Sequence, residues 1–488
     1  MIIARLKWTL AGKAPIVALL LGSHIVVADT LSDALASAYA NNPDIAAERA
    51  LVRQFDEGVP QALAFGRPGI SANVSEQQSG SGGFVDAGRT LQSQIAITQS
   101  LYRGGRTRVA VNAAENRILA ARARLRATEN IIMVNVVTAY SDVLRYAELV
   151  SLNANQVRVL ERELQASRDR FEVGDLTRTD VAQSDARLAN ARSQLQVAQG
   201  QLATARNAYM RVVGRPAEDL QPVPPLPPLP GSSGQAVDLA NINNPNLLAA
   251  RYDEAASRFD VTSIERQRLP TVGVSAGAGY SQFNGGSSGA SSSVNGAPSG
   301  SSFGFFSQSA TLQAIIPLYQ AGQVGSQIRQ AQERRNQLLA TIGAVGRQVA
   351  ESATNAVVGL QTSRALIQSS QVAVDANTLA LEGVKQENQV GTRTVLEVLN
   401  AEQELLQTRA NLVSARRDEY VAGYNLLAAV GQAEGDALAV STDTYDSTAN
   451  ARAVRHKWND FDQNPSSPAL PLPDPGLASR SVPIGPPR

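Results

Sequence analysis

The sequence of 488 residues contains no cysteine and only two histidines, His24 and His456. Without cysteine the chain has no disulfide, no thiol nucleophile, no cysteine-ligated zinc and no lipidated N-terminal cysteine. Residues 29–455 hold no histidine, which excludes Ser-His-Asp triads and histidine metal sites from the body of the protein. We therefore expect no catalytic residue, no metal site and no cofactor site, and we expect that the protein is not an enzyme.

Charged and aromatic residues are also scarce. Charged residues make up 18% of the chain and aromatic residues 5%, and the formal net charge is +1. Soluble domains usually carry about 25% charged residues. Because proteins that bind nucleic acid usually show a clear basic excess, nucleic acid is not an expected partner. Few aromatics fit either an elongated rod of helices or a thin-walled helical tube.

Downstream of its first 28 residues the chain lacks any apolar run of the roughly 20 residues that a spanning helix needs. An apolar run at 14–27 follows the cations Arg5, Lys7 and Lys13. This arrangement predicts a signal peptide over residues 1–28, cleaved after Ala28. A buried helix or membrane anchor is the alternative. If the mature protein lies in a membrane, strands must span it.

The chain consists of two similar halves. Ala-Asn-Asn-Pro at 40–43 recurs as Ile-Asn-Asn-Pro at 242–245, and Leu-Tyr-Arg-Gly-Gly at 101–105 recurs as Leu-Tyr-Gln-Ala-Gly at 318–322. Such self-similarity predicts a duplicated architecture. We expect a first repeat over 29–221, a proline-rich extended linker over 222–235, a second repeat over 236–432 and a disordered polar, proline-rich tail over 433–488.

Residues 69–215 and 318–463 contain no proline, which permits very long helices. Apolar residues recur every seven positions, each followed three residues later by a small one. The clearest series is Val181, Leu188, Leu195 and Leu202, with Ser184, Ala191, Ala198 and Ala205. This is coiled-coil periodicity with small residues on one seam. We predict long helices over about 106–213 and 323–430.

Two strand-like segments precede each helical pair, at about 69–102 and 270–319. In the first, Ile70, Ala72 and Val74 alternate with Ser71, Asn73 and Ser75. Such alternation gives a strand one apolar and one polar face and is a weak signature of a membrane barrel. A soluble hairpin packed on a helix is the alternative. Four strands cannot close a barrel, so a membrane barrel would need several chains, and three or more if its lumen conducts.

The order of helix, two strands, long helix, glycine turn and long helix in both halves resembles the TolC-like outer-membrane channels of efflux and type I secretion. The resemblance covers residues 30–432. Its most specific stretch is Val-Gly-Thr-Arg-Thr-Val-Leu-Glu-Val-Leu at 390–399, with a counterpart at 173–181. The Leu-Tyr-x-x-Gly pair at 101–105 and 318–322 is a second hallmark.

The resemblance implies an α+β fold in a homotrimer. Four strands from each protomer would form one shared antiparallel transmembrane β-barrel, and long coiled-coil helices would form an α-helical barrel. It places the protein in outer-membrane lipid of a Gram-negative cell, with the helices in the periplasm. It implies passive export of small molecules or proteins, with a periplasmic adaptor and an inner-membrane pump of ABC or RND type as partners. The alternative is a periplasmic coiled-coil adaptor or scaffold without a pore.

The resemblance also assigns a closing device. Arg393 corresponds to an arginine that tethers neighbouring coils in the closed state, and Thr179 and Asp180 correspond to its partners. The alternative is a solvated arginine at a helix start. Asn388 stands where a tethering tyrosine is often found, so we expect fewer tethers.

Glu397 corresponds to an acidic constriction residue, of which three copies would form a ring that favours cations. A glutamate that stabilises a helix N-terminus is an equal alternative. Asn400 occupies a second acidic position, so the ring is expected to be less charged. The two glycine turns are expected to be tips at which adaptor hairpins dock. The tip residues are Gly174, Val390, Gly391 and Thr392.

Overall fold

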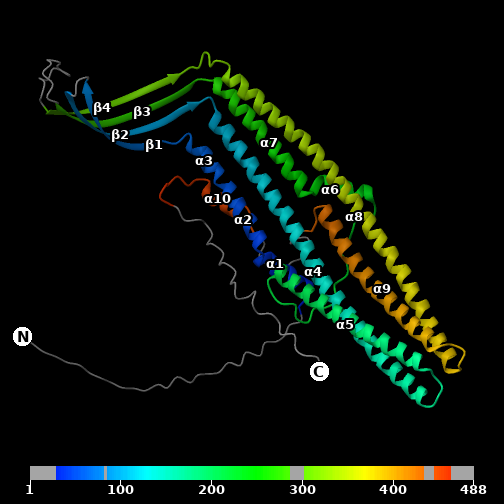
Figure 1. The fold of residues 1–488 in the computed structure, drawn as a ribbon. Coiled ribbons are helices and arrows are strands. Elements are labelled where there is room, and N and C mark those ends of the chain that lie inside the picture. The colour runs from blue at the N-terminus through cyan, green and yellow to red at the C-terminus, as the bar shows by residue number, and fades with distance from the viewer. Residues whose placement is uncertain (1–28, 82–84, 286–301, 434–444, 463–488) are drawn as a thin grey trace, which may run out of the picture.

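The computed structural model of the chain describes residues 29–81, 85–285, 302–433 and 445–462. The predicted signal peptide, over residues 1–28, lies outside this part. Figure 1 shows a sheet at one end of the molecule, from which long helices run to two hairpin turns at the other end. Long helices and an antiparallel sheet in one chain confirm the α+β class.

Both halves have the same order of elements. The first contains α1 (Leu31–Asn41), α2 (Pro43–Asp56), α3 (Gly58–Ala64), β1 (Gly69–Ser81), β2 (Val85–Arg103), α4 (Arg106–Glu172) and α5 (Arg178–Val213). The second contains α6 (Ser233–Asn243), α7 (Pro245–Glu265), the 3-10 turn η1 (Arg266–Arg268), β3 (Thr271–Gly285), β4 (Ser302–Ile315), α8 (Gln323–Gln389) and α9 (Val395–Ala429).

The helices α4 and α8 contain 67 residues each. At 1.5 Å per residue each is about 100 Å long. The small residues predicted on the seam of α5 are buried against α4, and the hydroxyls of Ser167 and Ser184 lie 3.2 Å apart across it. Small seam residues let two helix axes approach closely, so the hairpin forms a thin wall rather than a thick core.

The sheet has the order β1-β2-β3-β4, and all three pairings are antiparallel. Pairing of β2 with β3 joins the two repeats. One row across the sheet contains Ile70, Ile97, Ala276 and Ala310, and another contains Asn73, Gln94, Gly279 and Ser307. Since side chains alternate along a strand, the register gathers apolar side chains on one face and polar ones on the other.

The strands β3 and β4 continue into the glycine-, serine- and phenylalanine-rich stretch between them. β3 ends at Gly285 and β4 begins at Ser302. The ring of Phe283 lies 5.5 Å from that of Phe303, which is its cross-strand partner. Aromatic cross-strand pairs stabilise a ladder, which explains the extension.

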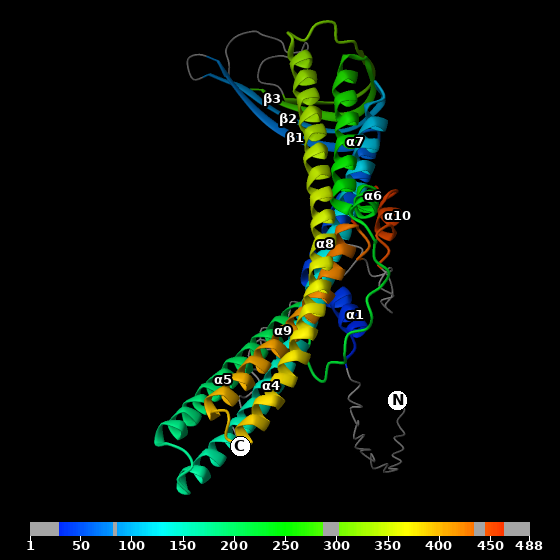
Figure 2. The ribbon, with the colours of Figure 1, turned by 90° about the vertical axis from the view of Figure 1, so that its right-hand side faces the viewer.

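The middle of the molecule holds the apolar cores. The first contains buried residues of α1, α2, α4, α5 and α9, and the second those of α6, α7, α8 and α9. The linker contributes Leu226 and Leu229 to their edges. Figure 2 shows α1 and α6 against the long helices at this level. No helix in the part of the chain that the structure describes is both long and apolar enough to cross a membrane.

Part of the expected tail is ordered. A short helix, α10 (Ala449–Val454), lies within the range 433–488 for which disorder was expected. The amide of Asn450 donates to Asp56 at 2.9 Å, and Arg455 pairs with Glu115 at 2.8 Å. These contacts hold residues 445–462 against α2 and α4. The polar, proline-rich composition predicted disorder, because composition carries no information about specific polar contacts between distant residues.

Candidate functional site at the helical tips

The two hairpin turns at the far end of the long helices share one construction. Gly174 has φ +85° and Gly391 has φ +81°, a left-handed conformation that glycine adopts without strain. The amide of Asp175 donates to the carbonyl of Arg170 at 2.9 Å, and the amide of Thr392 donates to that of Glu387 at 3.0 Å. Each turn therefore satisfies the last carbonyls of its long helix.

Both returning helices begin with a capping box. The hydroxyl of Thr177 accepts from the amide of Asp180, and the Asp180 carboxylate accepts from the amide of Thr177 at 3.0 Å. Thr394 and Glu397 repeat this arrangement, with the Thr394 amide 2.8 Å from Glu397. Each box satisfies free amides of the first helical turn. The two carboxylates are thus structural equivalents in the two repeats.

These contacts lower the pKa of both carboxyl groups. Hydrogen bonds from the Thr177 hydroxyl and amide lower that of Asp180. The amide of Thr394, followed by the guanidinium of Arg393, lowers the pKa of Glu397. Hydrogen bonds to the ionised form favour that form, so both groups carry their charge at neutral pH.

Arg393 is the centre of an ion-pair bridge across the second turn. Its Nε donates to Glu387 at 2.7 Å and its Nη1 donates to Glu397 at 2.8 Å. Glu387 lies near the end of α8 and Glu397 in the first turn of α9, so Arg393 connects the two arms of this hairpin. In the first hairpin the equivalent position holds Leu176, which packs against a small apolar cluster.

Two asparagines connect the hairpins to each other. Arg170, near the end of α4, donates to the amide oxygen of Asn388 at 3.3 Å. Arg187, on α5, donates to Asn400 at 2.6 Å. Asn388 led us to expect fewer tethers, and Asn400 a less charged ring, in the closed assembly. Within this protomer each asparagine accepts a hydrogen bond from an arginine of the first hairpin, and both expectations stay predictions.

Apolar packing supports the same junction. Val395 and Leu399 at the start of α9 are buried among Leu160 and Leu164 of α4 and Leu188 of α5. Lys385 and Glu402 form an ion pair between α8 and α9, and Glu402 is buried. Figure 2 shows α4, α5, α8 and α9 side by side above the two tips. The packing seats the start of α9 on the first hairpin.

The structure brings together some of the predicted site residues and not others. Arg393 and Glu397 are in contact. Thr179 is exposed on the first tip, and Asp180 is occupied by its own capping box. Within this protomer Arg393 pairs with the two glutamates rather than with Thr179 or Asp180, so the tether stays a prediction about neighbouring coils.

Sequence reasoning missed Glu387, Arg170 and Arg187. The signal for Glu387 was present, because a carboxylate six residues before an arginine spans a glycine turn. Nothing local could indicate the two arginines, because their partners lie 218 and 213 residues away along the chain.

Comparison with known proteins decides the family. The profile of the family described as "Outer membrane efflux protein" matches residues 34–215 and 236–432, most of the chain. The chain belongs to the outer membrane efflux protein family. Its two matched segments correspond to the two structural repeats, and the proline-rich segment between them falls outside the match.

Several members of the outer membrane efflux protein family are similar over most of their length. The outer membrane efflux protein BepC of Brucella suis is 32% identical over 440 residues, which are 90% of this chain and 93% of that protein. TolC of Vibrio cholerae is 24% identical and covers 84% of this chain and 92% of its own. A solved structure of CusC shares the fold, with a TM-score of 0.69, 20% identity and coverage of 83% of this chain and 92% of that one.

Membership confirms the resemblance read from the sequence. It also confirms the outer membrane as the location and an outer-membrane efflux or secretion channel as the function. The outer membrane efflux protein family is a family of channels, not of enzymes. The comparisons give no support to a periplasmic adaptor or scaffold.

Proposed function

We propose that the chain is one protomer of a trimeric exit duct that spans the outer membrane and the periplasm. In this duct, solutes or proteins pass from an inner-membrane pump, coupled through a periplasmic adaptor, to the outside. The pump would be of ABC or RND type, and its energy would drive transport, while the duct itself is passive. The first 28 residues would direct export and be removed after Ala28.

The observation that carries this proposal is the sheet at the end of helices about 100 Å long. Its apolar face includes exposed Ile70, Ile95 and Leu312. The outer edges of β1 and β4 have no partner within the described chain. An exposed apolar face with open edges is unstable in water and in lipid unless neighbouring copies complete it. Three copies supply twelve strands, enough for an aqueous lumen.

The tips are proposed as the gate. Arg393 would tether the second hairpin to Thr179 and Asp180 of a neighbouring coil in the closed trimer. The bridge to Glu387 and Glu397 supports this proposal, because it holds the guanidinium at the tip surface. Charge-assisted arginine contacts are directional and can exchange partners at moderate cost.

Glu397 and Asn400 are proposed as constriction residues. Arg393 compensates the charge of Glu397, and Arg187 contacts Asn400. A ring of three such sites would therefore prefer cations only modestly. The exposed turn residues Gly174, Val390, Gly391 and Thr392 are proposed as the surface on which adaptor hairpins dock.

Reconstitution in planar lipid bilayers tests the duct directly. We expect single channels with low resting conductance and a cation preference that falls in the Glu397→Ala variant. A purified protein that forms no trimer and conducts no ions would refute the duct. An unchanged reversal potential in Glu397→Ala would remove Glu397 from the pore while leaving the duct intact. Crosslinking at Gly391 or Thr392 in cells should recover the adaptor.

A further inference from the structure

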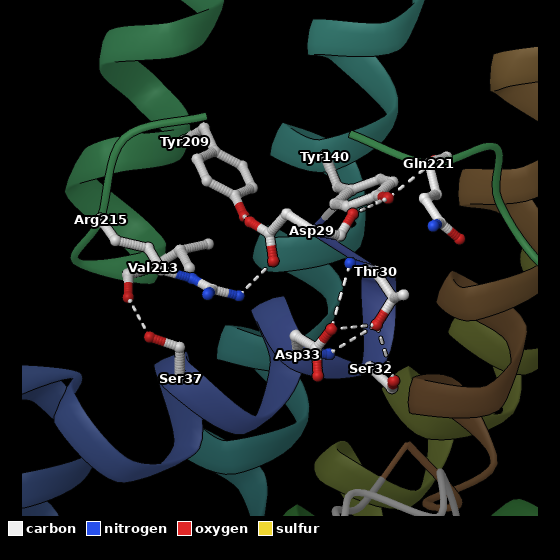
Figure 3. Close-up of polar contacts among 10 residues, drawn as sticks. All are labelled: Asp29, Thr30, Ser32, Asp33, Ser37, Tyr140, Tyr209, Val213, Arg215 and Gln221. Atoms are coloured by element: carbon white, nitrogen blue, oxygen red, sulfur yellow. Dashed lines mark hydrogen bonds and ion pairs between the residues drawn. The ribbon is translucent and has the colours of Figure 1, made fainter. Parts of the chain in front are cut away.

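A polar cluster surrounds Asp29, the first residue that the structure describes, in the middle of the molecule (Figure 3). The side chain of Asp29 is buried, with a residue exposure of 7%. The hydroxyl of Tyr209 donates to its Oδ2 at 2.6 Å, and Arg215 forms an ion pair with its Oδ1. The hydroxyl of Tyr140 lies 2.9 Å from the carbonyl oxygen of Asp29 and 2.7 Å from that of Gln221, and the amide of Gln221 donates to the Asp29 carbonyl at 3.1 Å.

The cluster is built to hold one residue. Tyr140 and Tyr209 are fully buried. The hydroxyl of Tyr209 donates to the Asp29 carboxylate, and the hydroxyl of Tyr140 lies between the carbonyl oxygens of Asp29 and Gln221. Burial, followed by the carboxylate of Asp29, raises the pKa of Tyr209, so its hydroxyl stays a donor. A buried carboxylate is stable only when charged and polar partners compensate its lost hydration. Asp29 has both.

Four segments meet at this residue. Tyr140 belongs to α4 and Tyr209 to α5, while Arg215 lies in the turn after α5 and Gln221 immediately precedes the proline-rich linker. Asp29 itself precedes Thr30, the N-cap of α1. Its contacts therefore fix the start of α1, the closure of the first helical hairpin and the path of the linker at one point.

The second repeat provides an internal comparison, because its fold is the same and its chain is continuous. The position of Asp29 is taken there by Gly231, which likewise precedes the N-cap of its helix. The positions of Tyr140, Tyr209 and Arg215 are taken by Val357, Leu426 and Gln432, of which the first two are buried apolar residues. The polar cluster is thus specific to the first repeat.

The second repeat holds its own start in a different way. The linker joins it covalently to the first repeat, and Leu226 and Leu229 of this linker pack against the cores. A Cβ added to Gly423 of α9 would lie 2.7 Å from Leu226, so the leucine fits closely over a glycine. The first repeat has no preceding linker once a leader is removed, and free chain ends fray unless contacts fix them.

We propose that Tyr140, Tyr209, Arg215 and the main chain of Gln221 form a binding site for the processed N-terminal residue, Asp29. The ligand is an aspartate at position one of the mature chain. The site provides hydrogen-bond donors to both its carboxylate and its carbonyl oxygen. The inference goes beyond the duct and rests on removal of the leader after Ala28.

The site requires a first residue with a short, negatively charged side chain. Glutamate would extend the carboxylate by one methylene, so its carboxylate and carbonyl would not reach both sets of donors at once. Cleavage one residue later would leave Arg215 without its carboxylate and the Tyr209 hydroxyl buried without an acceptor. Such groups are costly to leave unpaired. Accurate processing and docking of α1 are therefore linked.

Hydrogen–deuterium exchange on the full-length purified trimer tests the site, together with the mass of its N-terminal peptide. We expect the mature chain to begin at Asp29. In Asp29→Asn we expect the α1 amides (residues 31–41) to exchange at least about tenfold faster, because a buried charge-assisted contact is lost. The α6 amides (residues 233–243) should not change. Tyr209→Phe keeps the ring in place and should give a smaller increase in α1.

Asp44→Asn is the matched control, because Asp44 is an exposed carboxylate in the first turn of α2, outside the cluster. It should leave exchange in α1 unchanged. If Asp29→Asn fails to accumulate, α1 exchange in Tyr209→Phe alone tests the proposal. Equal α1 exchange in Tyr209→Phe and Asp44→Asn would overturn the proposal, and so would a mature chain that begins elsewhere. Neither readout depends on conduction, so this failure is distinguishable from failure of the proposed duct.

Discussion

At the scale of single residues, the same local chemistry has different consequences in the two repeats. Both tips have a left-handed glycine and a capping box, but in the second the turn itself contains an arginine, Arg393, that pairs with a carboxylate of each arm. The first has Leu176, which packs inward. Duplication therefore supplied two equivalent turns, and differences at single positions gave one of them an exposed polar bridge.

Arg393→Ser should open the tip more often. The substitution removes both ion pairs of the bridge and the proposed tether to a neighbouring coil. Exposed ion pairs are individually weak, so we expect a rise in resting conductance of about two- to fivefold. Planar-bilayer recording measures it. Arg178→Ser, which removes an exposed arginine from the other tip, is the control. Equal closed-state conductance in the two variants would contradict the role of Arg393.

Acid should weaken the same tip. Glutamate ordinarily has a pKa of about 4.3. The pKa of Glu397 lies below this value, so its ionised form stabilises the turn at every pH above the ordinary value. This stabilisation is lost as the pH falls from about 4 through the lowered pKa. We expect resting conductance to rise in that window in the wild type. Glu397→Gln should already leak at neutral pH and rise less on acidification.

The rise that remains in Glu397→Gln would come from Asp180, whose pKa is also lowered. The double variant with Asp180→Asn should therefore respond least to pH between about 4 and 2. A wild type and a double variant with the same acid response would show that neither capping carboxylate controls the closed state.

At the scale of elements, glycines with the same backbone conformation should differ in cost. Gly391 has φ +81° and would have no atom within 4 Å of an added Cβ, so Gly391→Ala costs only backbone strain, about 1 kcal/mol. Gly431, after α9, has φ +77°, and its Cβ would lie 2.5 Å from the carbonyl oxygen of Asn243. Gly431→Ala should cost about 2 kcal/mol more, because the turn between α6 and α7 must move.

Thermal unfolding of the purified trimers compares the two glycine variants. Gly431→Ala should lower Tm clearly and Gly391→Ala only slightly. Equal shifts would mean that the contact of Gly431 with the turn between α6 and α7 does not limit stability. Bilayer recording of Gly391→Ala would in turn separate stability from gating, because its turn is exposed at the proposed adaptor surface.

The elements were largely predictable, because their signals are local. Seven-residue spacing and the absence of proline indicated α4, α5, α8 and α9, and Gly174 and Gly391 marked the turns between them. Contacts between distant segments were not predictable. The link from Arg187 to Asn400 and the cluster around Asp29 depend on how helices pack, which neither propensity nor periodicity encodes. The pairing of Phe283 with Phe303 between β3 and β4 is likewise a contact between separate segments.

At the scale of the whole molecule, each protomer is incomplete. The helices bury their seams within the chain, but the sheet exposes apolar side chains on one face and leaves its outer edges unpaired within the described chain. The register links the four strands into continuous rows, some of them apolar, such as the row with Ile97 and Ala276, and others polar, such as the row with Asn73 and Gln94. A surface of this kind matches lipid on one side and water on the other, which is what a shared membrane wall requires.

Two neighbouring residues of β2 test this assignment of faces. Ile95 is 59% exposed on the apolar face, and Gln94 is exposed on the opposite one. Ile95→Arg would place a charge against lipid, at a cost of up to about 2–4 kcal/mol near the membrane centre and less near its surface. We expect less trimer in the outer membrane, measured by cell fractionation and native electrophoresis. Gln94→Arg, which faces the proposed water-filled lumen, should assemble like the wild type. If both variants assembled equally well, the apolar face would not contact lipid, and if only Gln94→Arg failed, the two faces would have to be exchanged.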